Sequence, residues 1–395
     1  ILSSLKPSDV AITSRSDNGG SGHALYDLRL KSNDSNAAPA PKWILKHWSP
    51  GQKGYYNLGI EHCIEGYAFH RGVFKQLPPG IDVPIIAATQ VETDRSVWLV
   101  MDDVSFELSQ YGRTHQRPYD IAEARLRTIL SWLARLHVHW DSSQLLADLE
   151  QEQTTLDIST VMWLYATLYS SALGEAPRYH ATIGKVADPE ITARLIAFLD
   201  WLPDDIRPLW RDALIDRHNL VEQIVALPHT LLHGDLDDRN VGLRYRSGSE
   251  TADGLVLIDW EFCGIGPAGV DVGKLLLQFG GVVDLQNVPT VPIRQFVDDL
   301  SNHYATEYRR CGGSACSQEQ LTKGIQLGFV KECLAPVSLV FGELILAAQQ
   351  CGKYEAVHTP GFDKENVVDG FVEMALLWAA EVVDCATLYM QRHMQ

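Results

Sequence analysis

The sequence lacks the features of a membrane or secreted protein. No hydrophobic run approaches the roughly 18–20 uninterrupted residues of a membrane span. The first residues, ILSSLKPSDV, do not combine a basic start with a long apolar run, so no signal peptide is recognised. Seven cysteines form an odd, scattered set, which argues against a disulfide framework. The one close pair, Cys311 and Cys316, has no second pair or histidine cluster to complete a zinc site. We expect a protein of the reducing cytoplasm, with no membrane contact.

Positive charge is also scarce. The chain has 33 Lys and Arg against 50 Asp and Glu, which gives a formal net charge of -17. Nucleic acid is therefore not expected as a partner, because its phosphate backbone is itself negative. A cationic substrate would suit this charge, although many soluble proteins are acidic. The oligomeric state is left open by the sequence.

The first hundred residues alternate between strand-like and turn-like segments. Residues 23–30 and 42–48 are predicted strands, separated by a polar loop that contains proline. Residues 60–77 show helical periodicity, and residues 96–101 form the clearest later strand. The pattern predicts a small β-rich lobe with one helix over residues 1–103.

Helical patterns dominate after that point. Residues 121–140 carry an apolar stripe that is expected to face a core: Leu126, Ile129, Leu130, Leu133 and Leu136. Residues 150–226 and 290–395 are also mostly helical in pattern, and one β-like island interrupts them at 227–262. We therefore expect an α+β protein of two lobes, the second being a large helical lobe over residues 104–395 that contains the small β island.

The island holds a cluster of groups suited to chemistry. His233, Asp235 and Asn240 form the pattern H-x-D-x-x-x-x-N, and Asp259 ends a later apolar strand in LIDWE. Metal-assisted phosphoryl transfer needs one carboxylate to take the proton of the acceptor hydroxyl, and it needs amide and carboxylate oxygens to hold metal ions on the nucleotide phosphates. Such hard oxygen ligands suit Mg²⁺ rather than zinc. A polar hairpin would explain the first motif alone, but not the downstream aspartate in this order.

These segments resemble a known family. HGDLDDRN followed by LIDWEFCGIGPAGVDVGKLL is similar to the aminoglycoside phosphotransferase and choline kinase-like family, which comprises small-molecule kinases with a protein-kinase-like fold. The resemblance implies that Asp235 is the catalytic base and that Asn240 and Asp259 are the Mg²⁺ ligands. It also implies that His233 braces the loop and that Asp271 is a structural acid on the following helix.

The same resemblance implies residues that bind ATP. Lys46 in WILKHW would neutralise the nucleotide phosphates, with Lys42 as the competing choice. Glu65 would hold that lysine, with Glu61 one turn earlier as its competitor. Glu261 matches a family acid near the metals or the acceptor.

Two further segments complete the expected nucleotide site. Residues 17–28 form a glycine-rich turn whose backbone N–H groups could face phosphates, with Ser21 and Gly22 closest. A hinge that offers backbone groups to adenine is expected just after the strand at 96–101. Its residues are Met101, Asp103 and Val104.

The motif does not explain Asp237 and Asp238, because those loop positions are neutral in many relatives. Either these carboxylates face an amine-bearing acceptor, or they pair with Arg239, Arg244 or another basic side chain. We favour the structural pairing.

The sequence therefore predicts an ATP-dependent phosphotransferase that phosphorylates a hydroxyl of a small molecule with Mg²⁺-bound ATP. The acceptor classes considered are aminoglycoside-like, choline-like and other natural products, including amine-bearing ones. The alternative is a nucleotide-binding pseudokinase that acts as an interaction protein. The intact set of Lys46, Asp235, Asn240 and Asp259 favours the enzyme. A protein kinase is disfavoured, because D-F-G and A-P-E signatures are missing.

Overall fold

The computed structural model describes residues 10–14, 24–30, 42–49, 63–104, 119–141, 189–215, 218–236, 240–246, 249, 251–282, 292–334, 341–346 and 371–394. The chain divides into two compact units. The N-terminal unit comprises Ile1–Arg113 and Arg239–Glu261, and the helical unit comprises Thr114–Asp238 and Phe262–Gln395. The division of the sequence at residue 103 stays a prediction, because compactness alone does not define a domain.

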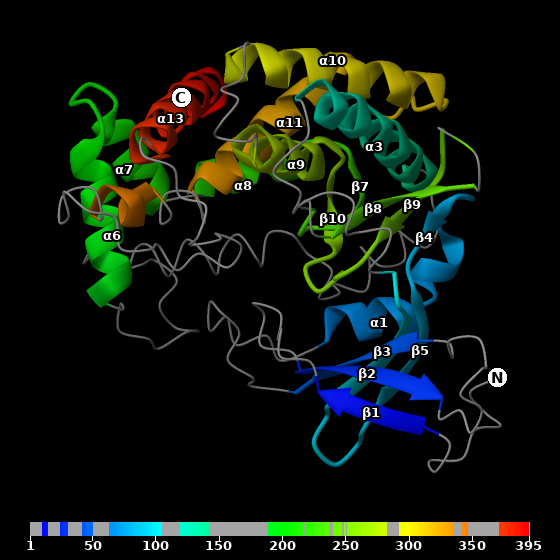
Figure 1. Ribbon diagram of the computed structural model, residues 1–395. Coiled ribbons are helices and arrows are strands. Elements are labelled where there is room, and N and C mark those ends of the chain that lie inside the picture. Colours follow the sequence, from blue (N-terminus) through cyan, green and yellow to red (C-terminus); the bar gives the residue numbers. More distant parts are fainter. Residues whose placement is uncertain are drawn as a thin grey trace. The chain divides into compact units, whose positions relative to one another are not determined.

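The N-terminal unit is built on a five-stranded antiparallel sheet in the order β1-β2-β3-β6-β5 (Figure 1). Its strands are β1 (Val10–Ser14), β2 (Ala24–Leu30), β3 (Lys42–Trp48), β5 (Ile85–Gln90) and β6 (Val97–Asp102). The register pairs Lys46 with Leu25 of β2 on one side and with Leu99 of β6 on the other. Lys46 therefore lies on the central strand of this sheet.

The core of this unit lies between the sheet and the helix α1 (Ile64–His70). Val97 and Leu99 of β6 point into it, as the period of two along a strand requires. The helix predicted over 60–77 is interrupted at Gly72, whose left-handed φ of 76° starts the short 3₁₀ helix η3 (Val73–Gln76). Residues 60–62 lie outside the described part.

A second, three-stranded sheet completes the N-terminal unit. Strands β8 (Val241–Tyr245) and β9 (Ala252–Leu257) form an antiparallel hairpin, and β4 (Ile81–Asp82) pairs in parallel with β9. The predicted β island is therefore divided. Its later strands pair with β4 of the N-terminal unit, whereas β7 (His229–Leu232) pairs with β10 (Gly264–Pro267) in the helical unit.

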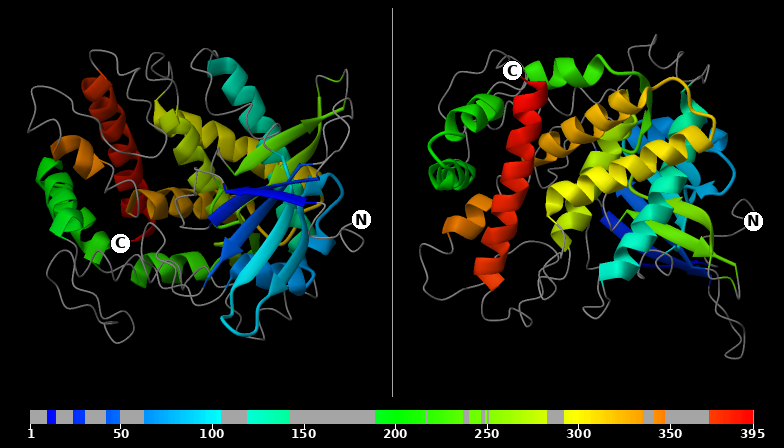
Figure 2. Two further views of the ribbon diagram at one scale, coloured as in Figure 1. Left: turned by 60° about the horizontal axis from the view of Figure 1, so that its bottom comes forward. Right: turned by 90° about the horizontal axis from the view of Figure 1, so that it is seen from above.

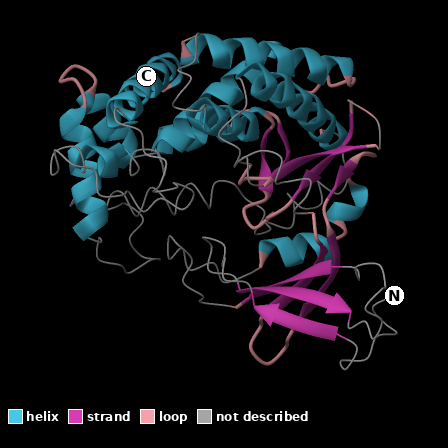
Figure 3. Cartoon of the chain, viewed as in Figure 1, coloured by secondary structure: helices cyan, strands magenta, loops and turns pink. Residues whose placement is uncertain are grey.

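The helical unit consists mostly of helices, drawn in cyan in Figure 3. Its labelled helices are α3 (Tyr119–Trp140), α6 (Pro189–Trp201), α7 (Arg207–Ile215), α8 (His218–Val225), α9 (Gly269–Val282), α10 (Ile293–Arg310), α11 (Gln318–Glu332) and α13 (Phe371–His393). The predicted stripe of α3 is confirmed, since Leu126, Ile129, Leu130, Leu133 and Leu136 are all fully buried. Helix α10 packs alongside α3 (Figure 2). The predicted α+β architecture is confirmed. Within the described residues, no helix is long and apolar enough to cross a membrane.

Helices α9 and α11 approach each other unusually closely. A Cβ atom on Gly273 of α9 would lie 2.3 Å from the carbonyl oxygen of Ile325, and one on Gly328 of α11 would lie 2.5 Å from that of Val270. Real side chains do not fit at such distances, so glycine is required on both helices for the backbones to meet. This contact fixes the helix that follows the LIDWE segment.

Candidate active site

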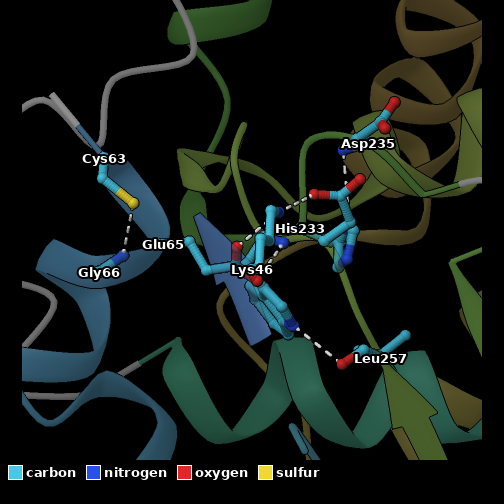
Figure 4. Close-up of polar contacts among 9 residues, drawn as sticks. Lys46, Cys63, Glu65, Gly66, His233, Asp235 and Leu257 are labelled. Carbon is cyan, nitrogen blue, oxygen red and sulfur yellow. Dashed lines mark hydrogen bonds and ion pairs between the residues drawn. The ribbon is translucent and has the colours of Figure 1, made fainter. Parts of the chain in front are cut away.

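A buried lysine joins two carboxylates in the N-terminal unit. The Nζ atom of Lys46 lies 2.7 Å from Oε2 of Glu65 and 2.5 Å from Oδ1 of Asp259. The side chain of Lys46 is only 7% exposed, whereas that of Asp259 is 29% exposed. Figure 4 shows Lys46 reaching from β3 toward Glu65 on α1. The cluster thus has one side reachable from solvent.

The charge of Lys46 is maintained by its neighbours. Burial alone disfavours an ammonium ion and lowers its pKa. The carboxylates of Asp259, Glu65 and Glu261 outweigh that effect, and the pKa of Lys46 is held well above its ordinary value. Lys46 is therefore held in its charged form by carboxylates from more than one segment of the chain.

Glu65 is held by the backbone as well as by Lys46. Its Oε1 atom accepts a hydrogen bond from the backbone N–H of Trp260 at 3.2 Å, and its residue is 1% exposed. Cys63 caps α1 by accepting a hydrogen bond from the N–H of Gly66 (Figure 4). The structure therefore brings Glu65 to Lys46. The competitor Glu61 and the side chain of Lys42 lie outside the described residues.

Asn240 and Asp259 lie at the same end of the β8–β9 hairpin. The N–H of Ile258 donates to the carbonyl oxygen of Asn240 at 3.0 Å, which sets Asn240 opposite the residue that precedes Asp259. Asp259 has a φ of 62°, a left-handed conformation that is strained for most residues. Such strain persists where the surroundings require one side-chain direction. The hairpin end therefore presents one amide and one carboxylate, both hard oxygen donors that fit Mg²⁺.

In the helical unit, Asp271 of α9 holds the loop that carries the H-G-D motif. Its carboxylate accepts hydrogen bonds from the backbone N–H groups of His233, at 2.6 Å, and Gly234, at 2.9 Å. His233 is fully buried, and its Nδ1 accepts a bond from the N–H of Asp235 at 3.3 Å (Figure 4). The predicted bracing role of His233 and the structural role of Asp271 remain proposals that these contacts support.

Steric crowding explains why the H-G-D motif has glycine at position 234. Gly234 has a φ of 80°, and a Cβ atom there would lie 1.9 Å from the carbonyl oxygen of Phe262. Both the conformation and the space exclude every other residue. Asp235 directly follows this tight turn, three residues after the end of β7, and its side chain is 20% exposed.

His137 is fully buried, and its Nε2 atom lies 3.9 Å from Oδ2 of Asp271, the residue that holds this loop. Its Nδ1 lies 2.7 Å from the hydroxyl oxygen of Tyr304. Burial lowers the pKa of His137 to about 4, against the opposing effect of Asp271. A histidine that is neutral and enclosed in this way is a packing residue.

One contact of Asp235 was not anticipated from the sequence. The Nζ atom of Lys274 on α9 lies 2.5 Å from Oδ1 of Asp235. The spacing in GVDVGKLL could have indicated this contact. Lys274 follows Asp271 by three positions and therefore lies on the same side of the helix as Asp271.

The structure describes some of the remaining predicted residues. Met101 packs against the sheet core near the end of β6, Val104 is buried, and Asp103 is half-buried. Glu261 is half-buried two residues after Asp259. Arg244 of β8 pairs with Asp82 of β4, the strand on the other side of β9. Four predicted residues lie outside the described part: Ser21, Gly22, Asp237 and Asp238.

Comparison with known families identifies the larger group. The model of the phosphotransferase enzyme family matches residues 106–312, just over half of the 395 residues. The chain belongs to the phosphotransferase enzyme family. The matched range of this phosphotransferase contains Asp235, Asn240 and Asp259, whereas Lys46 and Glu65 precede it.

Several solved structures resemble this phosphotransferase at low sequence identity. An ethanolamine kinase from Plasmodium vivax is 12% identical, with 99% of this chain and 86% of that chain covered and a TM-score of 0.49. An amicoumacin kinase in complex with AMP-PNP and Ca²⁺ is 14% identical, with 96% and 89% covered and a TM-score of 0.48. A choline kinase from Cryptosporidium parvum is 10% identical, with 99% and 92% covered and a TM-score of 0.48. No curated protein matches the sequence.

Proposed function

We propose that this phosphotransferase transfers the γ-phosphoryl group of ATP to a hydroxyl group of a small molecule. The observation that carries the proposal is the buried Lys46, held between Glu65 and Asp259. Desolvating such a group of charges costs stability, so a mixed cluster of this kind is better explained by function than by folding. An ammonium fixed on the central strand suits the phosphates of a nucleotide.

The proposed metal is Mg²⁺, held by Asn240 and Asp259. When bound, Mg²⁺ would neutralise negative charge on the nucleotide phosphates. By residue type, Lys46, Glu65, Asp259 and Glu261 carry one positive and three negative formal charges. That excess of negative charge supports a divalent cation near Asp259. Glu261 is proposed to lie near the metal or the acceptor.

Asp235 is proposed as the general base. The acceptor oxygen attacks the γ-phosphorus, the bond from that phosphorus to the β-phosphate oxygen breaks, and the acceptor proton passes to the Asp235 carboxylate. ADP is the leaving group. Positioning and charge neutralisation supply most of the rate in reactions of this kind.

Further residues complete the proposed nucleotide and acceptor sites. The backbone at Met101, Asp103 and Val104 is proposed to meet adenine, because it spans the end of β6 and the residues directly after it. Ser21 and Gly22 are proposed for the phosphates, and Asp237 and Asp238 for pairing with basic side chains or an amine on the acceptor. The net charge of -17 supports an amine-bearing acceptor.

The buried Cys333 and Cys385 are not in disulfides, which supports action in the cytoplasm.

The test is a screen of hydroxylated amines, sugars and nucleosides with MgATP. ADP release that depends on the acceptor, followed by mass spectrometry of a phosphorylated product, is expected. Asp235→Asn should lower turnover by about 10²–10⁴-fold, the range of a general base. Asp204→Asn makes the same chemical change at a side chain that is 92% exposed in the helical unit, and should leave turnover unchanged.

The pseudokinase alternative predicts the opposite result. It predicts that ATP binds but that no acceptor increases ADP release. Near-normal turnover of Asp235→Asn would instead keep the kinase and remove Asp235 as its base.

A further inference from the structure

Asp235 is one end of a row of alternating charges in the helical unit, formed by Asp235, Lys274, Glu332 and Lys331. Lys274 Nζ lies 2.5 Å from Asp235 Oδ1 and 3.7 Å from Glu332 Oε2. Lys331 Nζ lies 2.7 Å from the other carboxylate oxygen of Glu332, Oε1. Each oxygen of Glu332 therefore faces an ammonium, and Lys274 links Glu332 to Asp235. We call these four residues the charge row.

The charge row is largely removed from water. Glu332 and Lys331 are 3% and 5% exposed, and the side chain of Lys274 is 12% exposed. Burial disfavours the charged form of Glu332, but the ammonium groups of Lys274 and Lys331 outweigh it and hold the pKa of Glu332 below its ordinary value. Buried ion pairs seldom repay their desolvation in stability. The charge row is therefore better explained by a role in function than by a contribution to stability.

The backbone holds the middle of the charge row rigidly. Lys274 directly follows Gly273, and Glu332 lies one helical turn after Gly328. Gly273 and Gly328 are two of the glycines through which α9 and α11 touch. Close backbone contact leaves little freedom for either helix to slide. The position of the Lys274 ammonium is thus set by the helix pair and not by the loop that carries Asp235.

We propose that Lys274 is a positioning residue for Asp235, and that Glu332, neutralised on its far side by Lys331, anchors Lys274. The proposal rests on the proposed function of Asp235 as the base. An ammonium bound to Oδ1 orients the carboxylate so that Oδ2 takes the acceptor proton, and it favours the ionised form that a base requires. Among the described residues of this unit, the groups that act on Asp235 include Lys274 of α9, Glu332 of α11 and His233 of its own loop.

The activity test compares Lys274→Met, Lys274→Arg and Glu332→Gln with wild type. ADP release from MgATP is measured with the best acceptor of the screen, or with water alone if none is found. Lys274→Met should lower kcat about tenfold to a hundredfold, as misplacement of a reacting group does, and leave KM for ATP within about twofold. The acidic limb of its pH profile should move up by about one pH unit. Lys274→Arg should recover most of kcat, and Glu332→Gln should fall between.

The matched control is Lys323→Met, a lysine of α11, the helix that packs against α9. Lys323 donates a hydrogen bond to the neutral Gln223 at 2.6 Å and takes no part in the charge row. It should keep the wild-type kcat and pH profile. If Lys274→Met also keeps both, the positioning role is wrong. If Asp235→Asn keeps wild-type turnover, the proposed base is wrong, and the positioning role falls with it.

A second measurement needs no catalysis and covers a variant that folds poorly. Unfolding free energies, measured by urea denaturation of wild type, Asp235→Asn, Lys274→Met and the double variant, form a double-mutant cycle. The double variant should lose clearly less unfolding free energy than the two single variants lose in sum, because each single change leaves a charge without its partner. Additive losses would show that Asp235 and Lys274 do not interact, and would overturn the proposal.

Discussion

The ammonium of Lys46 lies 2.5 Å from a carboxylate oxygen of Asp259, although 213 positions separate the two residues in the chain. Lys46 comes from the central strand of the five-stranded sheet, and Asp259 follows the β8–β9 hairpin. The contact joins the two sheets of the N-terminal unit at one buried charge. It is also the point at which the proposed phosphate and metal ligands meet.

Replacing Lys46 tests the proposed phosphate contact. Lys46→Met keeps the length and the apolar stem of the side chain but removes the charge, so kcat/KM for ATP should fall on the order of a hundredfold or more. Lys75→Met removes an exposed lysine of the same unit and should change neither parameter. Steady-state kinetics at varied ATP concentration measures both. Unchanged ATP dependence in Lys46→Met would transfer the role to another residue.

Removal of the divalent ion tests the proposed Mg²⁺ ligands. ATP affinity by calorimetry should drop about tenfold or more when EDTA replaces Mg²⁺, because the phosphates lose their neutralising charge. In Asp259→Asn the difference between the two conditions should shrink. Asparagine tolerates the left-handed φ of 62°, so the variant should fold. Asp94→Asn, at an exposed turn of the same unit, is the control. An undiminished Mg²⁺ effect in Asp259→Asn would contradict the assignment.

Two glycines with the same backbone conformation separate strain from steric clash. Gly72 and Gly234 have φ values of 76° and 80°, but a Cβ atom meets nothing within 4 Å at Gly72 and lies 1.9 Å from Phe262 O at Gly234. Gly72→Ala should cost about 1 kcal/mol of unfolding free energy, the cost of the left-handed conformation. Gly234→Ala should cost about 3 kcal/mol or more and disrupt the loop of Asp235. Urea denaturation measures both, and equal losses would contradict the clash.

The buried His137 predicts a pH dependence of stability. Its pKa is about 4 in the folded protein, below the ordinary value of 6.5. The unfolded chain therefore binds the proton more tightly, and stability from this residue is complete above pH 6.5 and is lost as the pH falls toward 4. The slope is up to about 1.4 kcal/mol per pH unit.

Unfolding free energies between pH 7 and pH 4.5 test that slope. His137→Gln cannot titrate, so its stability should fall less steeply with acid than that of wild type. His139→Gln, at an exposed position of the same helix, should retain the wild-type slope. Parallel curves for wild type and His137→Gln would exclude the buried histidine as the cause.

Local sequence was sufficient for most of the elements that are described. The short apolar run over 96–101 and the apolar stripe over 121–140 led to β6 and α3, because each pattern depends only on neighbouring residues. The interruption of the predicted helix at Gly72 was missed, since a glycine inside a helical pattern is often tolerated. The four-residue β10 has no strand pattern in GIGP and exists through its pairing with β7.

The chemical groups of the candidate site follow from the chain itself. The order His233, Asp235, Asn240 and then Asp259 indicates a base and hard oxygen ligands, because spacing along a loop and a strand end is a local property. Their catalytic roles remain predictions. The contacts that hold these groups in place were decided by the tertiary structure. They are Glu65 with Lys46, Asp271 with the loop of His233, and Lys274 and Glu332 with Asp235. These pairs form only when distant elements pack, and the close glycine contact of α9 with α11 arises from long-range burial that one-dimensional patterns do not encode.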